Sequence, residues 1–366
     1  ENGWTITNNV EEADLVLFRA CGLTLSAVEN SFHVIRKLNA KKKGNANFIV
    51  WGCLPKIDKE SLRSVYSGIT FGEDEVNILD KILEATKPIA DVTANYCVPL
   101  FELKPPAWNV RLERFFSKKF NIVVSEREFI IKASTGCLGN CSYCNVRKSR
   151  GLVHSKSIEE VVAEFRNGLE KGFRYFSLLG TDLGAYGRDL GYNLVDLLVE
   201  LTKEKGDYKI GLRNINPYYL NEMFEELRPI FAGGKISFLL TAAQSGSDRI
   251  LKLMRRRYKI QDFIRCIQIL NNEYPNIILR SQIMVGFPTE TNKDFQMSMQ
   301  LIDELKFDWV EIYKFSPNKG TLAATMMDQV PEHIKEISYK QLNTKNKLQS
   351  PHLRVRALTK LRKIFS

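Results

Sequence analysis

The sequence has 366 residues, 44% of them hydrophobic and 26% charged, which is typical of a globular protein and excludes a disordered or fibrous chain. No stretch approaches the ~20 apolar residues that a transmembrane helix requires, so a membrane-spanning protein is excluded as well. The formal net charge of +11 points to an acidic partner such as nucleic acid or an acidic peptide, although a general bias toward lysine would have the same effect.

The first part of the chain is predicted to form a small parallel α/β domain over residues 1–95. Short apolar runs indicate buried strands, and apolar residues at helical spacing indicate helices between them. Strands that alternate with helices favour a parallel sheet. The predicted elements are a strand at 14–18, a helix over 26–40, a strand at 47–51, and helices from about 59 and over 76–85.

A cysteine follows each of these two predicted strands, Cys21 after the first and Cys53 after the second. Ligands gather at the carboxyl ends of the strands in open α/β sheets, so the two thiols can converge on one metal centre. The alternative is that both are unrelated small core residues.

The remaining chain divides into a linker, a second α/β region and a basic end. Residues 96–126 contain a Pro-Pro pair and are predicted to be a linker, which also carries Cys97. Residues 127–330 show six strand–helix units, too few for a closed eight-fold barrel. Residues 331–366 are predicted to be a basic helical segment. The predicted strands of the six units lie near 129–131, 175–179, 210–212, 236–240, 277–280 and 309–312.

Three cysteines, Cys137, Cys141 and Cys144, follow the first strand of this second region at the spacing C-x3-C-x2-C. Three thiolates leave one iron of a four-iron cluster open, and an open metal position serves catalysis. A structural zinc site is the alternative, but such sites pair two close cysteines with a second close pair.

The triad, with Tyr143 just before its last cysteine, resembles the signature of the radical S-adenosylmethionine (SAM) superfamily. This resemblance implies a partial (β/α)6 barrel, in which the open iron of a [4Fe-4S] cluster binds SAM and splits it into methionine and a 5′-deoxyadenosyl radical. The fold class expected for the whole chain is therefore α/β, a small parallel domain followed by this partial barrel.

The same resemblance assigns SAM contacts to residues at the ends of the successive strands. Asp182 is expected to accept hydrogen bonds from the SAM amino group, and Arg213 to pair with its carboxylate. Gly286 permits close approach of the backbone to adenine. Each position could instead be an ordinary turn or capping residue. The complete set of expected SAM-binding residues is Tyr143, Gly180, Thr181, Asp182, Arg213, Gln244, Ile283 and Gly286.

Motifs along most of the chain are similar to those of methylthiotransferases, and most similar to the subgroup that modifies N6-threonylcarbamoyladenosine in tRNA. The family holds an auxiliary [4Fe-4S] cluster with three cysteines. This resemblance assigns Cys21 and Cys53 to that cluster and places the third ligand upstream of residue 1, with Cys97 as a less favoured substitute. The matching segments are 11–21, 50–53, 134–144, 150–151, 184–191, 244–251, 286–291 and 320–324.

Three departures from the family pattern concern the substrate. This chain reads Thr241-Ala-Ala-Gln244-Ser-Gly where the family commonly has His-x-Pro-x-Gln-Ser-Gly, it has Gln282 where the family has Asp, and it has Lys319 where the family has Pro. The sequence also shows no room for the RNA-binding β-barrel of the tRNA-modifying members. These features favour a peptide or protein side chain, which is the substrate expected from the sequence. The alternative, favoured by the positive charge and the motifs, is a hypermodified tRNA adenosine next to the anticodon.

The resemblance implies an enzyme with two [4Fe-4S] clusters that inserts a methylthio group into an unactivated C–H bond. Its partners are expected to be a macromolecular substrate and an electron donor such as flavodoxin or ferredoxin, with no membrane. The cluster motif favours a reducing cytoplasm. The alternatives are a radical SAM enzyme whose second cluster only transfers electrons, and a non-catalytic RNA-binding relative.

Overall fold

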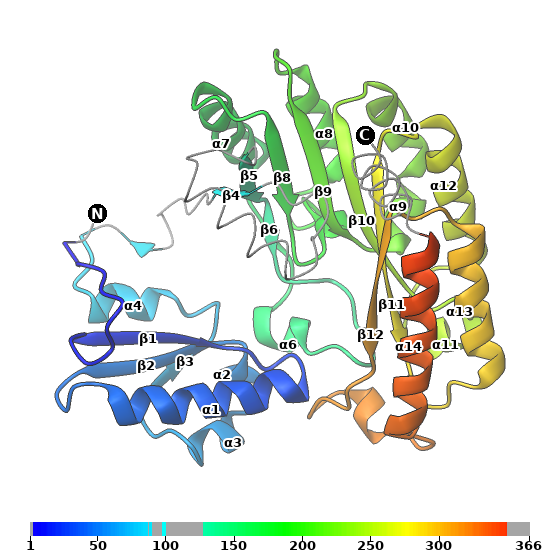
Figure 1. Cartoon of the computed structure of the whole chain (residues 1–366). Helices are drawn as coiled ribbons and strands as arrows, with labels where there is room; N and C mark the ends of the chain where they lie inside the picture. The colour runs from blue at the N-terminus through cyan, green and yellow to red at the C-terminus, as the bar shows by residue number, and fades with distance from the viewer. Residues whose placement is uncertain (1–2, 87, 90–96, 100–126, 350–366) are drawn as a thin grey trace, which may run out of the picture.

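The computed structural model describes residues 3–86, 88–89, 97–99 and 127–349, and Figure 1 shows their arrangement. A three-stranded sheet has the order β1-β2-β3, and a seven-stranded sheet has the order β12-β11-β10-β9-β8-β5-β4. The strands are β1 Leu15–Ala20, β2 Asn47–Gly52, β3 Ile69–Phe71, β4 Cys97–Pro99, β5 Arg127–Lys132, β6 Ser134–Thr135, β7 His154–Ser155, β8 Tyr175–Leu179, β9 Lys209–Ile215, β10 Ile236–Gln244, β11 Ile278–Val285 and β12 Trp309–Lys314.

The helices connect successive strands. They are α1 Leu25–Lys41, α2 Leu54–Ile57, α3 Lys59–Arg63, α4 Asn77–Ile82, α6 Val146–Arg150, α7 Ile158–Glu170, α8 Leu194–Lys203, α9 Pro217–Glu222, α10 Phe224–Ala232, α11 Asp248–Leu253, α12 Ile260–Glu273, α13 Asn292–Glu304 and α14 Glu332–Gln349, with 3-10 turns η2 Leu183–Ala185 and η3 Leu322–Thr325. None of the described helices combines the length and the apolar character that a bilayer span requires.

The small sheet is parallel throughout, as the alternation of elements predicts. Ala20 pairs with Gly52 at the carboxyl ends of β1 and β2, so Cys21 and Cys53 follow at neighbouring positions. Gly52 has a φ of +110°, and a Cβ there would lie 2.9 Å from the Ala20 carbonyl oxygen. Only glycine therefore allows the end of β2 to approach β1 so closely.

The larger sheet confirms the partial (β/α)6 barrel. Its strands β5, β8, β9, β10, β11 and β12 lie side by side in chain order, and all are parallel. Figure 1 shows helices α7, α8, α10, α12 and α13 along the outside of this sheet. Because all six strands point the same way, their carboxyl ends form one mouth, where sites gather in such folds.

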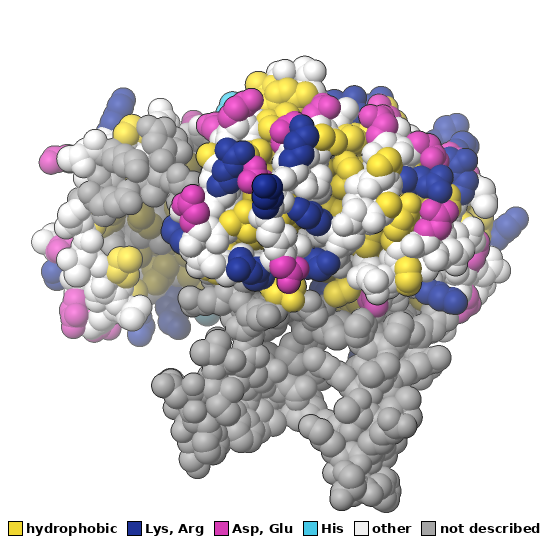
Figure 2. All heavy atoms as spheres, turned by 90° about the horizontal axis from the view of Figure 1, so that it is seen from above, with side chains coloured by type: hydrophobic (Ala, Val, Ile, Leu, Met, Phe, Trp, Pro, Cys, Tyr) yellow, Lys and Arg dark blue, Asp and Glu magenta, His cyan; other side chains and the backbone are white. Residues whose placement is uncertain are grey.

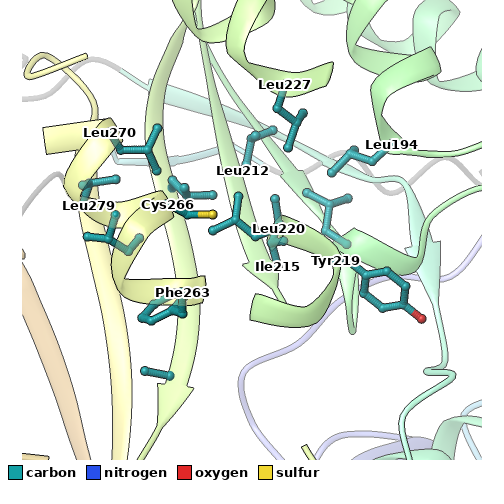
Figure 3. Packing of buried hydrophobic residues seen from close by; sticks show 14 of the residues in the cluster. Leu194, Leu212, Ile215, Tyr219, Leu220, Leu227, Phe263, Cys266, Leu270 and Leu279 are labelled. Carbon is teal, nitrogen blue, oxygen red and sulfur yellow. The ribbon is translucent and has the colours of Figure 1, made fainter. Parts of the chain in front are cut away.

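Buried aliphatic and aromatic side chains fill the space between the barrel strands and their helices. Figure 3 shows Cys266 on α12 pointing toward Leu212 and Leu220, and only 1% of its surface is exposed. This thiol is a core residue, as its place in a helical apolar pattern indicates. Figure 2 shows the face of the molecule seen from above, where acidic and basic side chains are interspersed.

Several short strands differ from the sequence prediction. β3 was not expected, β4 lies within the predicted linker, and the short pair β6 and β7 was not expected either, whereas α14 begins at Glu332, at the start of the segment predicted to be helical. β4 runs antiparallel to β5 at the edge of the barrel sheet. The predicted basic segment after residue 349 and most of the predicted linker lie outside the described residues.

Asp294 joins the start of α13 to the start of α11. The Asp294 side chain forms a capping box with Thr291. Its carboxylate also accepts a hydrogen bond from Ser247 Oγ at 2.6 Å and forms an ion pair with Arg249. Burial alone would raise the pKa of Asp294. The hydrogen bonds from Arg249, Ser247 and Thr291 outweigh this effect and hold the pKa well below its usual range.

Asp294→Asn should therefore destabilise the protein at pH 7 by roughly 2 kcal/mol. The expected loss is no larger because Arg249 is half exposed, so solvent screens its ion pair with Asp294. Because the pKa of Asp294 is lower in the folded state than in the unfolded state, ionised Asp294 stabilises the folded protein fully at pH values above the unfolded pKa of about 3.9. This stabilisation is lost as the pH falls from there through the folded-state pKa. Urea unfolding at pH 7 and at pH 3 measures both effects. An equal loss of stability at the two pH values would contradict the role of the ionised carboxylate.

Candidate functional site

The three clustered cysteines lie in a loop at the mouth of the barrel, between β6 and β7. These two short strands pair with each other, Ser134 with Ser155, so they close the base of the loop. Gly136 has a φ of +73°, and a Cβ there would lie 1.8 Å from the Leu152 carbonyl oxygen. The two ends of the loop can therefore meet only because residue 136 is glycine.

Each thiol in this loop has an N–H donor within reach. The Gly139 amide lies 3.2 Å from Cys137 Sγ, the Val146 amide 3.4 Å from Cys144 Sγ, and Arg256 Nη1 3.7 Å from Cys141 Sγ. N–H donors of this kind tune the potential of iron–sulfur clusters.

The loop also keeps space open between its thiols. A Cβ on Gly139 would come within 3.2 Å of Cys137 Sγ and 3.8 Å of Cys141 Sγ. Burial, followed by the neighbouring Asp182 carboxylate, raises the pKa of Cys137 to about 12, and burial raises the pKa of Cys144 to about 11. Thiolates here need a bound cation to offset the burial, so the donor set fits a cluster.

Within the described ranges, no three or more His, Cys, Asp or Glu side chains converge to hold a single metal ion. A zinc ion needs its ligands around one point, whereas a four-iron cluster takes each thiolate on a different iron. The separate positions of Cys137 Sγ and Cys141 Sγ beside Gly139 suit the second arrangement. Cys137, Cys141 and Cys144 are thus brought into one loop, and their role as cluster ligands stays a prediction.

The cluster loop is fixed to the rest of the barrel at several points. The backbone N–H and the hydroxyl of Ser142 donate to the carbonyls of Met254 and Leu253, at 3.1 and 2.8 Å. The ring of Tyr143 packs edge-on against Phe287, with centroids 6.4 Å apart. Phe287 follows Gly286, so the loop and the end of β11 form one wall of the mouth.

Several residues expected to bind SAM surround this mouth. Asp182 is buried; it accepts a hydrogen bond from the Asn216 amide at 3.2 Å and lies 4.0 Å from Cys137 Sγ. Gly180 lies beside Ser134, whose hydroxyl would be 2.7 Å from a Cβ at that position. Thr181 accepts a hydrogen bond from Arg150 at 3.4 Å.

Gln244, at the end of β10, has the features of a binding residue. Its φ is +67°, a left-handed conformation that costs energy for a side chain of this kind. Among the described residues, nothing bonds the buried oxygens Gln244 Oε1, Thr241 Oγ1 and Ser134 Oγ. Buried polar atoms without a protein partner indicate a polar ligand or water at the mouth.

Arg213 has a different environment from the one expected for a SAM carboxylate contact. It pairs with Glu128 through Nη2, at 3.0 Å, and its Nε donates to Ser177 Oγ at 2.9 Å. Its guanidinium also stacks over Phe238, 4.9 Å from the ring centroid. A contact from Arg213 to SAM would have to coexist with this ion pair, and it stays a prediction.

Two further expected SAM contacts lie on β11. Ile283 is fully buried in the strand. Gly286 has a φ of +74° and donates its N–H to Glu290 at 2.5 Å, which shapes the turn after the strand. Burial raises the pKa of Glu290 to about 7.

The two cysteines expected to hold the auxiliary cluster, Cys21 and Cys53, lie at the mouth of the small sheet. Cys21 is exposed and its N–H donates to Ser31 Oγ, while Cys53 is only 4% exposed. The Cys53 thiol lies 3.6 Å from Glu73 Oε1, and burial, then Glu73, raises its pKa. Two thiols at neighbouring strand ends fit an auxiliary cluster that lacks its third protein ligand. A third cysteine is absent here among the residues whose side chains the structure describes.

Glu73 connects the two cysteine sets, a role that the sequence does not reveal. Its carboxylate pairs with Arg19, next to the end of β1, and with Arg150 of α6 at 2.9 Å. α6 begins two residues after Cys144, so the Glu73 side chain reaches both the thiol of Cys53 and the helix that follows the three clustered cysteines.

Other contacts join the small sheet to the barrel at the same place. Lys148 donates to the Ile57 carbonyl at 3.1 Å, and Asn318 donates to the Leu23 carbonyl at 2.7 Å. Figure 1 shows α6 between the small sheet and the barrel. The two sets of cysteines therefore open onto one shared interface.

The three residues that depart from the family pattern occupy different places. Thr241 lies in β10 and is buried, Gln282 in β11 donates to Glu311 at 3.1 Å, and Lys319 pairs with Asp58 at 2.9 Å across the interface. Lys319 is the one of the three that borders the space between the cysteine sets. Their contacts with a substrate stay predictions.

Two family models match the chain. The radical SAM superfamily matches residues 131–302, and the uncharacterized protein family UPF0004 matches residues 1–72. The first range contains the cluster loop and most of the barrel, and the second contains the small sheet with Cys21 and Cys53.

Solved structures show the same fold at low sequence identity. The radical SAM methyltransferase TsrM from Kitasatospora setae, bound to tryptophan and a SAM analogue, superposes with a TM-score of 0.58 at 13% identity. The match covers 84% of this chain and 64% of that one.

Curated relatives extend the similarity along the whole chain. The threonylcarbamoyladenosine tRNA methylthiotransferase MtaB of Thermotoga maritima is 30% identical over 96% of this chain and 77% of its own length. The human threonylcarbamoyladenosine tRNA methylthiotransferase is 31% identical over 93% of this chain, which spans 57% of that protein. The ribosomal protein uS12 methylthiotransferase RimO of Thermodesulfovibrio yellowstonii is 30% identical over 93% of this chain and 76% of its own length.

These matches cover both cysteine sets and the barrel that joins them. The chain therefore belongs to the radical SAM methylthiotransferases, enzymes that use SAM, a [4Fe-4S] cluster for its cleavage and a second cluster for methylthio transfer.

Proposed function

We propose that this enzyme transfers a methylthio group to N6-threonylcarbamoyladenosine in tRNA. Relatives named for this activity, from a bacterium and from human, match more than nine-tenths of the chain. The net charge of +11 suits a polyanionic substrate, since phosphate contacts dominate the affinity for nucleic acids. The proposal reverses the order of the two substrate classes expected from the sequence.

The observation that carries the proposal is the shared interface between the two cysteine sets. Exposed cations border it: Arg147 and Lys148 on α6, and Lys319 across from Asp58. A nucleoside placed there lies between the cluster loop and Cys21, with the exposed side chain of Arg147 near its phosphates.

In this proposal, residues 1–95 hold the auxiliary cluster and residues 127–330 bind SAM. The clusters supply the electron for SAM cleavage and the sulfur to be transferred. The chain's own residues orient the reactants and keep water away from them. The Glu73–Arg150 ion pair holds the two halves of the site at a fixed separation.

A direct test offers both substrate classes to the reduced enzyme with SAM that carries a labelled methyl group. One substrate is tRNA with N6-threonylcarbamoyladenosine, and the other is the ribosomal protein uS12. We expect the label in the modified adenosine after digestion to nucleosides, measured by mass spectrometry.

The Cys53→Ala variant serves as the matched control and should give no labelled nucleoside. Label recovered in uS12 and absent from tRNA would overturn the proposal and restore the protein substrate. A parallel titration should show that tRNA affinity falls steeply with salt, as phosphate contacts require.

A further inference from the structure

A basic cavity of about 700 Å³ lies beside the cluster loop. Leu138 and Asn140, which lie between Cys137 and Cys141 in the sequence, form part of its wall. The remaining wall comes from α11, the start of α12 and the segment between them. Its lining residues are Leu138, Asn140, Asp248, Lys252, Arg255, Arg256, Arg257, Tyr258, Lys259 and Asp262.

This cavity is separate from the predicted SAM and substrate positions. None of the expected SAM contacts lines it, and neither does any residue of the small sheet. Figure 1 shows α11 and α12 on the side of the barrel away from β1, β2 and β3. A macromolecule seated in the cavity would therefore leave the interface between the cysteine sets open.

The cavity wall is in direct contact with a predicted cluster ligand. Arg256 donates to Cys141 Sγ at 3.7 Å and to the Ala242 carbonyl at 2.8 Å. Ser142 ties the loop to Leu253 and Met254, just before the arginines. The cavity is thus a short route from the protein surface to the cluster position.

The charge of the cavity is strongly positive. Five of its lining residues are basic and two are acidic. Asp248 accepts a hydrogen bond from the Ile260 amide at 2.9 Å and lies 3.9 Å from Lys259 Nζ. Its carboxylate is therefore already paired with groups of the protein. Lys252 and Arg255 are exposed at the rim.

We infer that this cavity and its rim are the docking surface for an acidic one-electron carrier protein, of the flavin or iron–sulfur class. The carrier gives up one electron and the cluster in the Cys137 loop gains it; no bond forms or breaks. Redox encounters of this kind use small interfaces, and complementary charge steers them. The inference rests on SAM cleavage and does not depend on whether the substrate is tRNA.

The test compares the holoenzyme with the rim variant Lys252→Glu/Arg255→Glu, using flavodoxin with fully reduced FMN as the probe. We expect the second-order rate of cluster reduction to fall roughly tenfold or more at low ionic strength. The Kd for flavodoxin, measured by calorimetry, should rise in parallel. The wild-type rate should fall with added salt, and the variant's rate should be nearly independent of salt.

Two controls separate docking from damage to the enzyme. Dithionite, a small reductant, should support SAM cleavage equally in wild type and variant. Lys171→Glu/Lys205→Glu makes the same charge change at exposed positions just before β8 and β9, at the opposite ends of the strands, and should leave the flavodoxin rate unchanged. The neutral pair Lys252→Gln/Arg255→Gln should give an intermediate rate.

Equal flavodoxin rates in the rim variant and the wild type would overturn the inference. A rim variant that loses tRNA affinity and keeps the flavodoxin rate would overturn it too, because the surface would then bind a phosphate backbone.

Discussion

Replacing Cys137, Cys141 and Cys144 together by alanine should remove about half of the iron from the anaerobically reconstituted protein and abolish SAM cleavage. The three thiols sit in one loop with N–H donors at each sulfur, and the barrel mouth beside them holds the expected SAM contacts. Iron and sulfide per chain, and 5′-deoxyadenosine by chromatography, are the measurements.

The matched control is Cys266→Ala, which removes a thiol buried in the hydrophobic core of the barrel and should keep the full iron content. If the triple variant binds as much iron as the wild type, the assignment of the loop is wrong.

The second large effect concerns the small sheet. Cys21→Ala and Cys53→Ala should each abolish methylthio transfer while SAM cleavage continues, because cleavage needs only the open iron of the other cluster. The physical basis is the position of the two thiols at the ends of neighbouring strands, outside the barrel. Labelled product and 5′-deoxyadenosine, measured in the same reaction, separate the two activities.

Ser31→Ala is a useful control for Cys21, because it removes the hydroxyl that holds the Cys21 backbone without removing the thiol. It should reduce transfer much less than Cys21→Ala. A cysteine variant that retains the iron of the barrel cluster but fails to cleave SAM would refute this division of labour.

Sequence patterns predicted the barrel because its strands are long apolar runs separated by amphipathic helices. The strand Ile236–Gln244 and the helix Ile260–Glu273 each contain several periods of their pattern. β3 and β4 have three residues each, too few for any periodicity to show.

The site was predictable where it is local in sequence. The three cysteines of the loop lie within eight residues, so their spacing alone indicates a cluster. Glu73 and Arg256 reach the thiols of Cys53 and Cys141 across long stretches of chain, and no local pattern marks them. For the same reason the sequence could not show that Arg213 pairs with Glu128.

The short β6–β7 ladder has a consequence for how the enzyme acquires its iron. Joining the two ends of a flexible loop costs entropy, and here backbone pairing between Ser134 and Ser155 has already met that cost. Cluster binding therefore has less loop entropy to offset than it would in a loop whose ends are free.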